Sequence, residues 1–375
     1  MNGTHSDTHI IRYLVNKREL NELYVSTVLR TLAFSMIGIF VPLFLFKELA
    51  YTLQEIIYFY LVYSVFFLIF TPIGAKLGNY IGIKHLMLIS TPFYIAYFAM
   101  LYALENNPSW FYYIPTAYGI AEGLFWIGFH IDFSMFSQSK YRGNQISKFY
   151  GFALLAGLVG PMIGGAVLTF SDFNLLFFTV VLLLIGSAVP LFFSKDIKRD
   201  YKLSWKFLNI GSFKDFVSYS SFGAKGMVAG IFFPIFVFSI LGLYAVMGSL
   251  FTFLGLLNLA IIYFMGKLTD VFSKSKLVKI FSIFNSIIWV VKIFVKTKME
   301  LIGVAALSSS TDIAVSLPYT AIMYDKCKKN IDYLIFREVG LSIGRIIVLL
   351  LVLATGSLLS SFLYAAIASL GYMLL

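Results

Sequence analysis

Long apolar stretches alternate with short polar segments along almost the whole chain. A helix needs about 20 residues to cross the hydrocarbon core of a bilayer, and the stretches reach that length. The polar segments between them are short, so consecutive helices are expected to be antiparallel neighbours. The pattern predicts twelve membrane-spanning helices, near residues 24–46, 54–74, 84–104, 110–136, 145–170, 172–194, 216–240, 242–266, 277–296, 300–324, 332–355 and 357–375.

A half-length repeat divides these helices into two sets. Residues 38–46 read GIFVPLFLF and residues 230–238 read GIFFPIFVF, so six of nine positions are identical. A second pair, 75–79 and 266–270, repeats at almost the same offset. The repeated segments belong to helices that run in the same direction, which predicts two parallel six-helix pseudo-repeats. We expect an N-terminal bundle at 1–194, a basic cytoplasmic linker at 195–215 and a C-terminal bundle at 216–375.

The composition indicates an all-α integral membrane protein in contact with a lipid bilayer. Hydrophobic residues make up 59% of the sequence and charged residues 13%, about half the charged share of a typical soluble domain. Of the 29 Lys and Arg, 21 fall on the side of the N-terminus, five lie within spans, and Lys47, Lys296 and Lys298 face the other side. Basic residues gather on the cytoplasmic side, so we expect a multi-pass protein of the cell membrane with both termini cytoplasmic. This distribution explains the net charge of +11 without a nucleic-acid partner.

Two short motifs stand out against this background. Residues 74–84 read GAKLGNYIGIK between the second and third predicted helices, and their counterpart at 266–270 follows the eighth; residues 157–165, in the fifth helix, read GLVGPMIGG. With two parallel halves and a basic central linker, these motifs resemble those of the major facilitator superfamily. The resemblance implies a glycine-rich gating loop in each half, with the candidate residues Gly74, Asn79, Gly82, Gly266 and Asp270.

The gating loops depart from the family pattern in one half. Asn79 stands where the family has an acid, whereas Asp270 keeps the acid in the second copy. The resemblance implies that Asp270 faces the start of the fifth helix near Arg142, and that Asn79 supplies no charge opposite Arg337 and Glu338. The alternative is that these are solvated loop residues, each of which contributes little.

The fifth-helix element has a physical interpretation of its own. Its glycines remove side chains from one helix surface, so that another backbone can approach closely, and its proline removes one helical hydrogen bond. In the family this element is associated mainly with antiporters, which favours efflux; ordinary close packing is the alternative. The element comprises Gly157, Gly160, Pro161, Gly164 and Gly165.

Each half also carries one acid and one base within its spans. Ionisable residues there are costly and usually face an interior or a cavity. The resemblance implies that the first, fourth, seventh and tenth helices line a central cavity, and these helices carry Arg30, Glu122, Lys225 and Asp312. We expect one acid–base pair in each half, which binds the solute or carries protons. Two purely structural ion pairs are the alternative.

Aromatic side chains accompany the first of these acids. Tyr118, Trp126 and His130 share a helix face with Glu122 at four-residue spacing, and Trp126 is a further binding candidate. Such a wall suits a partly apolar or cationic solute, although aromatic residues are abundant throughout this chain. We expect His130 to be a packed residue near the end of its helix.

Three other ionisable residues also lie within spans. Arg345 is expected to pair with Glu338 one to two turns away on the same helix; the alternative is that it reaches an anionic solute. No role is expected for the other two. Asp132 and Lys292 lie toward helix ends, from which their side chains can extend to the membrane surface.

The sequence therefore predicts a secondary active transporter that moves a small solute by alternating access, coupled to protons. We expect a monomer without metal or other cofactor, since one cysteine and four scattered histidines offer no metal site. An enzyme is not expected, because the chain has no nucleotide-binding loop or recognisable catalytic set. The alternative is a membrane sensor or binding protein that keeps the fold without net transport.

Overall fold

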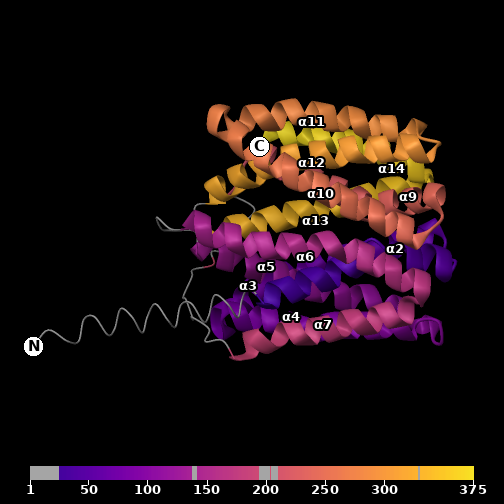
Figure 1. The fold of residues 1–375 in the computed structure, drawn as a ribbon. Helices are drawn as coiled ribbons and strands as arrows, with labels where there is room; N and C mark the ends of the chain where they lie inside the picture. The colour runs from indigo at the N-terminus through magenta and orange to yellow at the C-terminus, as the bar shows by residue number, and fades with distance from the viewer. Residues whose placement is uncertain (1–24, 137–141, 194–202, 204–209, 328–329) are drawn as a thin grey trace, which may run out of the picture.

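The computed structural model describes residues 25–136, 142–193, 203, 210–327 and 330–375. This part of the chain is a bundle of helices that lie side by side, with no strand among the described residues (Figure 1). In it, twelve helical spans run back and forth along the bundle, as the sequence predicts. We call the end of the bundle that carries the C-terminus the terminal end, and the other the distal end (Figure 1).

Six of these spans form the first half of the described chain. The first ends in two short segments, α2 (Val41–Leu43) and the π-helical turn η1 (Phe44–Glu48), and a 3-10 turn, η2 (Pro108–Tyr112), precedes the fourth. The spans are Val25–Glu48, α3 (Leu53–Ile81), α4 (Ile83–Ala103), α5 (Ile114–Phe136), α6 (Arg142–Phe170) and α7 (Phe173–Phe193).

The other six described spans form the second half. The first of them is built from α8 (Phe213–Met227), the π-helical turn η4 (Val228–Phe232) and α9 (Phe233–Leu241). The rest are α10 (Tyr244–Val271), α11 (Lys274–Val291) with η5 (Lys292–Phe294), α12 (Lys298–Cys327), α13 (Ile331–Thr355) and α14 (Leu358–Gly371) with η6 (Tyr372–Leu374).

The two sets of helices occupy opposite sides of the bundle. In Figure 1 the indigo-to-magenta helices of the first half lie on one side and the orange-to-yellow helices of the second half on the other. Across the boundary, α6 packs against α10 and α3 against α13. The domain limits stay a prediction, since most of the linker, at 194–202 and 204–209, lies outside the described residues.

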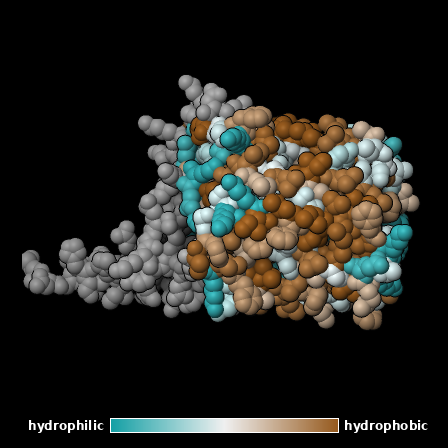
Figure 2. Space-filling model, turned by 90° about the horizontal axis from the view of Figure 1, so that it is seen from above, coloured by the Kyte–Doolittle hydropathy of each residue, from teal (hydrophilic) through white to brown (hydrophobic). Residues whose placement is uncertain are grey.

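The bundle surface carries a broad apolar belt between two polar ends (Figure 2). Large apolar side chains point outward within this belt; Leu182 is 52% exposed and Ile367 68%. Nine helices in the described part are by themselves long and apolar enough to cross a membrane, and two further apolar helices are shorter. Helices satisfy their own backbone hydrogen bonds, so such a belt is stable in lipid, where water is absent.

The repeated sequence coincides with a helix irregularity in each half. Pro42 lies in the short helix α2, between a turn at 38–40 and η1, and Pro234 begins α9 directly after η4. Proline has no N–H group to donate to the preceding turn, so a helix breaks or widens beside it. The first span is therefore divided near its distal end and the seventh near its middle.

The predicted gating loops are largely helical. Helix α3 continues to Ile81, and α10 to Val271, so Gly74, Asn79, Gly266 and Asp270 all lie within helices. Among the candidates Gly82 alone lies between helices, with a φ of 98° that favours glycine. The predicted ends were wrong because apolar runs end where polar residues begin, whereas helical hydrogen bonds continue through those residues.

Candidate functional site

Glu122 lies within α5 and accepts hydrogen bonds on both carboxylate oxygens. The Tyr94 hydroxyl on α4 donates to Oε1 at 2.5 Å, and the Trp126 indole Nε1, one turn along α5, donates to Oε2 at 2.8 Å. Trp126 is 37% exposed, so the site is open on that side. Both oxygens of this carboxylate are thus occupied by neutral donors.

Arg30 approaches this acid from the first span without pairing with it. Its guanidinium carbon lies 3.4 Å from the ring centre of Phe125, 4.4 Å from that of Tyr94 and 4.8 Å from that of Phe34. Among the described residues no ion pair joins Arg30 to Glu122. The expected acid–base pair of the first half is replaced by a tyrosine that contacts both groups, because aromatic rings fill the space between the two helices.

The second half holds a direct ion pair. Lys225 on α8 donates to Oδ1 of Asp312 on α12, as the sequence predicts. The Asn285 amide on α11 donates to the same oxygen at 2.7 Å, and Ser369 on α14 donates to the Asn285 carbonyl at 2.8 Å. Lys225 is 7% exposed, whereas the Asp312 side chain is 31% exposed. Four helices thus meet at one carboxylate.

Lys292 contradicts the expectation that it extends to the membrane surface. The residue is 1% exposed, and its Nζ lies 3.2 Å from the ring centre of Trp289 and 3.9 Å from that of Phe233. No carboxylate pairs with it among the described residues. It lies in η5, directly after α11, and the aromatic rings of Trp289 and Phe233 hold its ammonium group in the interior by cation–π contacts.

Arg345 also differs from the expectation, since it does not pair with Glu338. From α13 it reaches across to the first half, where its Nη1 donates to the Tyr63 hydroxyl on α3 at 3.4 Å and its guanidinium lies 4.4 Å from the Phe67 ring centre. Tyr63 stacks on Tyr118, with ring centres 4.6 Å apart. Arg345 is therefore a contact between the halves, in the middle of the bundle.

A second contact between the halves lies toward the terminal end. His130 on α5 accepts a hydrogen bond at Nε2 from Nη1 of Arg337 on α13, at 3.1 Å, and its Nδ1 lies 2.9 Å from the Tyr324 hydroxyl on α12. Arg337 also contacts Glu338, whose carboxylate lies 3.4 Å from His130 Nε2. Since Nε2 accepts, the imidazole carries its proton on Nδ1. His130 is packed as predicted, and it also joins the two halves.

The distal end has its own contact between the halves. The Tyr244 hydroxyl on α10 donates to Glu48 at the end of the first span. Lys47 lies 4.7 Å from the ring centre of Phe238 and 5.0 Å from that of Tyr244. We call the charged residues near the middle of the spans, Arg30, Glu122, Lys225, Asp312 and Arg345, the central site. Polar groups therefore join the halves at both ends of the bundle, on either side of this site.

The glycines of α6 lie against two neighbouring spans. A Cβ added at Gly160 would lie 1.9 Å from Ser35 Oγ, and one at Gly164 would lie 2.0 Å from the Met36 carbonyl oxygen, both in the first span. Gly157 faces the same span with more room, and a Cβ at Gly165 would lie 2.6 Å from the Tyr244 carbonyl oxygen of α10. The helix continues through Pro161, whose carbonyl lies against Gly248 of α10.

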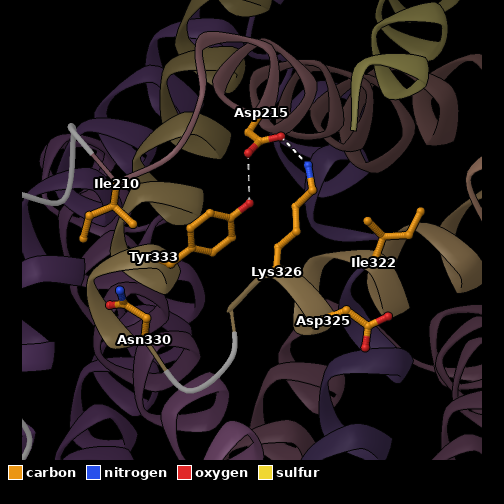
Figure 3. A pocket seen from close by; sticks show the side chains of 7 residues that line it. All are labelled: Ile210, Asp215, Ile322, Asp325, Lys326, Asn330 and Tyr333. Carbon is orange, nitrogen blue, oxygen red and sulfur yellow. Dashed lines mark hydrogen bonds and ion pairs between the residues drawn. The ribbon is translucent and has the colours of Figure 1, made fainter.

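Two peripheral pockets lie away from this centre. Figure 3 shows one of about 430 Å³ near the terminal end, where Asp215 accepts from Lys326 Nζ at 2.5 Å and from the Tyr333 hydroxyl at 3.3 Å. Another, of about 770 Å³, lies at the distal end between η2 and the start of α3. In the first pocket Asp215 and Lys326 satisfy each other, and Asp325 pairs with Lys274 outside the lining. Within the described residues no cluster of three or more His, Cys, Asp or Glu could hold a metal ion.

The sequence matches the model of the Major Facilitator Superfamily over residues 23–349. The chain belongs to this superfamily. No curated protein matches it. Its fold is that of solved superfamily transporters. The E. coli fucose:proton symporter FucP superposes with a TM-score of 0.61 at 13% identity, and the match covers 94% of this chain and 96% of that chain. The nucleoside transporter NupG superposes with a TM-score of 0.72 at 9% identity, and the match covers 95% of this chain and 97% of that chain.

The four predicted charges are arranged unequally in the two halves. Lys225 and Asp312 meet, whereas Arg30 and Glu122 are separated by Tyr94. Sequence reasoning missed Tyr94 and Asn285. Asn285 left a signal, because it is a polar residue inside an apolar run; Tyr94 left none in a chain with 24 tyrosines.

The gating candidates of this superfamily member are only partly visible. The side chains of Asp270 and Arg142 lie outside the described residues, so their expected contact is not described. Gly74 packs on α5, where an added Cβ would lie 3.0 Å from Ile127. Opposite Arg337 and Glu338, the first half contributes the neutral imidazole of His130 on α5.

Proposed function

We propose that the protein is a proton-coupled secondary transporter that moves a small solute by alternating access. Membership of the superfamily supports the proposal that the protein is a transporter. Its division into two similar halves supports a mechanism in which one half moves against the other. By the distribution of Lys and Arg we assign the terminal end to the cytoplasm. By the resemblance of the α6 element to that of antiporters, we assign the direction as efflux in exchange for protons.

The ion pair of Lys225 with Asp312 carries the proposal of proton coupling. Asp312 Oδ1 accepts from both Lys225 and Asn285, while Oδ2 makes no hydrogen bond within the described residues. The side chain is 31% exposed, so a proton can reach it. Protonation at Oδ2 would neutralise the partner of Lys225 and loosen the contact between α8 and α12.

Glu122 is the second candidate carrier. Its two hydrogen bonds, from Tyr94 and Trp126, leave no partner that accepts a proton from it. The side chains of Glu122, Trp126 and His130 follow one face of α5, and the rings of Trp126 and His130 stack at 5.7 Å. This row of three side chains on α5 connects the central site to the contact between His130 and Arg337.

The test is a distance measurement between spin labels, which needs no known substrate. In a Cys327→Ser background, one pair of labels replaces the exposed Tyr80 and Val271 at the terminal end, and another replaces Tyr112 and Met299 at the distal end. Acidification is expected to change the two distances in opposite directions. Asp312→Asn is expected to abolish the response.

The control is Asp325→Asn on the same helix. Asp325 also pairs with a lysine, Lys274 at 2.7 Å, but its side chain is 67% exposed at the periphery. This variant should respond to pH as the wild type does. Parallel changes at both ends would contradict alternating access, and an unchanged pH response in Asp312→Asn would contradict its role as proton carrier.

A further inference from the structure

The central site holds more positive than negative charge. Glu122 accepts two hydrogen bonds from aromatic side chains and lies near Arg30 across Tyr94 without touching it, and Asp312 is neutralised by Lys225. Within the described residues neither Arg30 nor Arg345 forms an ion pair with a carboxylate. Neither guanidinium group therefore has a carboxylate in contact, and the charge of Glu122 offsets only one of the two.

An uncompensated charge inside a membrane protein destabilises the fold. The free energy lost when an unpaired ion is buried is far larger than the free energy gained from a cation–π contact. Arg30 is 9% exposed, and aromatic rings are the groups in contact with its guanidinium. A ligand with negative charge would supply the partner that the protein itself does not.

The tyrosines between the two arginines offer a surface for the rest of such a ligand. Tyr118 is stacked between Tyr63 and Tyr97, with ring centres 4.6 and 4.5 Å away. At one side Tyr63 accepts from Arg345, and at the other Tyr94 lies under Arg30. The hydroxyls of Tyr97 and Tyr118 make no hydrogen bond among the described residues, so they remain available as donors.

We propose that the substrate is an organic anion whose apolar body lies on the tyrosine cluster and whose carboxylate or phosphate group is attracted by Arg30 and Arg345, which flank that cluster. The planar guanidinium fork donates two parallel hydrogen bonds to either group. The proposal rests on the proposed transport function, and it replaces the cationic solute that the acids alone suggest. Because the two arginines belong to different halves, the bound anion would draw the halves together.

The test is thermal denaturation of the purified full-length protein with matched compounds. Each aromatic or aliphatic body is offered as a carboxylate, a phosphate monoester, a neutral amide and an ammonium; benzoate, phenyl phosphate, benzamide and benzylamine form one such set. Ligands that bind the folded state raise the midpoint by mass action. We expect a rise with carboxylates or phosphates, and the better of the two identifies the anionic group.

Variants separate binding from a structural role. Arg30→Gln and Arg345→Gln are each expected to lower the affinity for the anion by about tenfold to a hundredfold, because one charged hydrogen-bonded contact is lost. Arg30→Lys and Arg345→Lys should restore part of the lost affinity. Without ligand, the glutamine variants should melt at the wild-type temperature or above, because an unpaired charge is removed; a structural arginine would lower that temperature.

The matched control is Lys276→Gln. Its amine also rests near a ring, 5.7 Å from the centre of Phe272, but on the exposed surface of α11, and this variant should bind as the wild type does. Stabilisation by amides or ammonium compounds alone, no effect of any anion, or anion binding as strong as in the wild type in both glutamine variants would overturn the proposal. Failure of transport itself would appear separately, as parallel label distances at the two ends.

Discussion

Among the described lysines, Lys292 is the most completely buried, and it lies against the Trp289 ring with no carboxylate in contact. Trp289 is itself fully buried, and its Nε1 has no hydrogen-bond partner among the described residues. Two polar groups in one apolar pocket therefore lack partners. At this scale the protein retains charge that its own stability does not require.

Replacement of Lys292 by methionine is expected to stabilise the protein. Methionine has a similar volume, and removal of an uncompensated buried charge should raise the free energy of unfolding by about 1–4 kcal/mol. The measurement is the thermal midpoint in detergent, with Lys276→Met on the exposed face of α11 as the control that should change little. A lower midpoint for Lys292→Met would show that the ammonium stabilises the fold.

At the scale of elements, α6 connects the halves through its glycines. Gly160 and Gly164 lie against the first span, while Gly165 lies against α10 of the other half. Absence of side chains lets backbones come close enough for extensive van der Waals contact, which is the main source of helix association in lipid. The glycine element acts through packing on both of its sides.

Gly164→Ala is expected to destabilise the bundle. The new methyl group would lie 2.0 Å from the Met36 carbonyl oxygen, so the first span and α6 must move apart, at a cost of about 1–3 kcal/mol. Gly303→Ala on α12 is the control, because an added Cβ there meets nothing within 4 Å and alanine favours the helix. Thermal midpoints of the two variants should move in opposite directions; a shared direction would contradict the packing argument.

At the scale of the whole molecule, polar contacts join the halves on both sides of the central site. His130 with Arg337 lies toward the terminal end, and Tyr244 with Glu48 at the distal end. Alternating access requires that one end opens while the other stays closed. The relative strength of the two contacts therefore sets which side of the site is open at rest.

Loss of either contact should open its own end. His130→Phe keeps a ring but removes both hydrogen bonds, and it should increase the distance between labels at positions 80 and 271. Tyr244→Phe removes one hydroxyl and should increase the distance between labels at 112 and 299 instead. Each variant serves as the control for the other. Equal effects of both variants at one end would show that these contacts do not gate separate sides.

The order and number of the spans could be predicted from the chain alone. About twenty apolar residues in a row are stable in lipid, and there only a helix provides their backbone groups with hydrogen bonds. The parallel halves were equally visible, since a repeat such as GIFVPLFLF survives in the sequence itself. Where helices end was less predictable. Helix α3 runs seven residues beyond its apolar run, to Ile81, because backbone hydrogen bonding does not depend on side-chain polarity.

The partners of the charged residues depended on the tertiary structure. Lys225 and Asp312 could be paired from their positions, but Arg30, Lys292 and Arg345 rest on aromatic rings that come from other helices. Charge and hydropathy are properties of single residues and can be counted along a chain. Which side chain faces which depends on helix rotation and close packing between distant segments. The sequence alone therefore determined a two-half membrane bundle with charged residues inside it, and only the packing of that bundle decided which charges are left without a counter-ion.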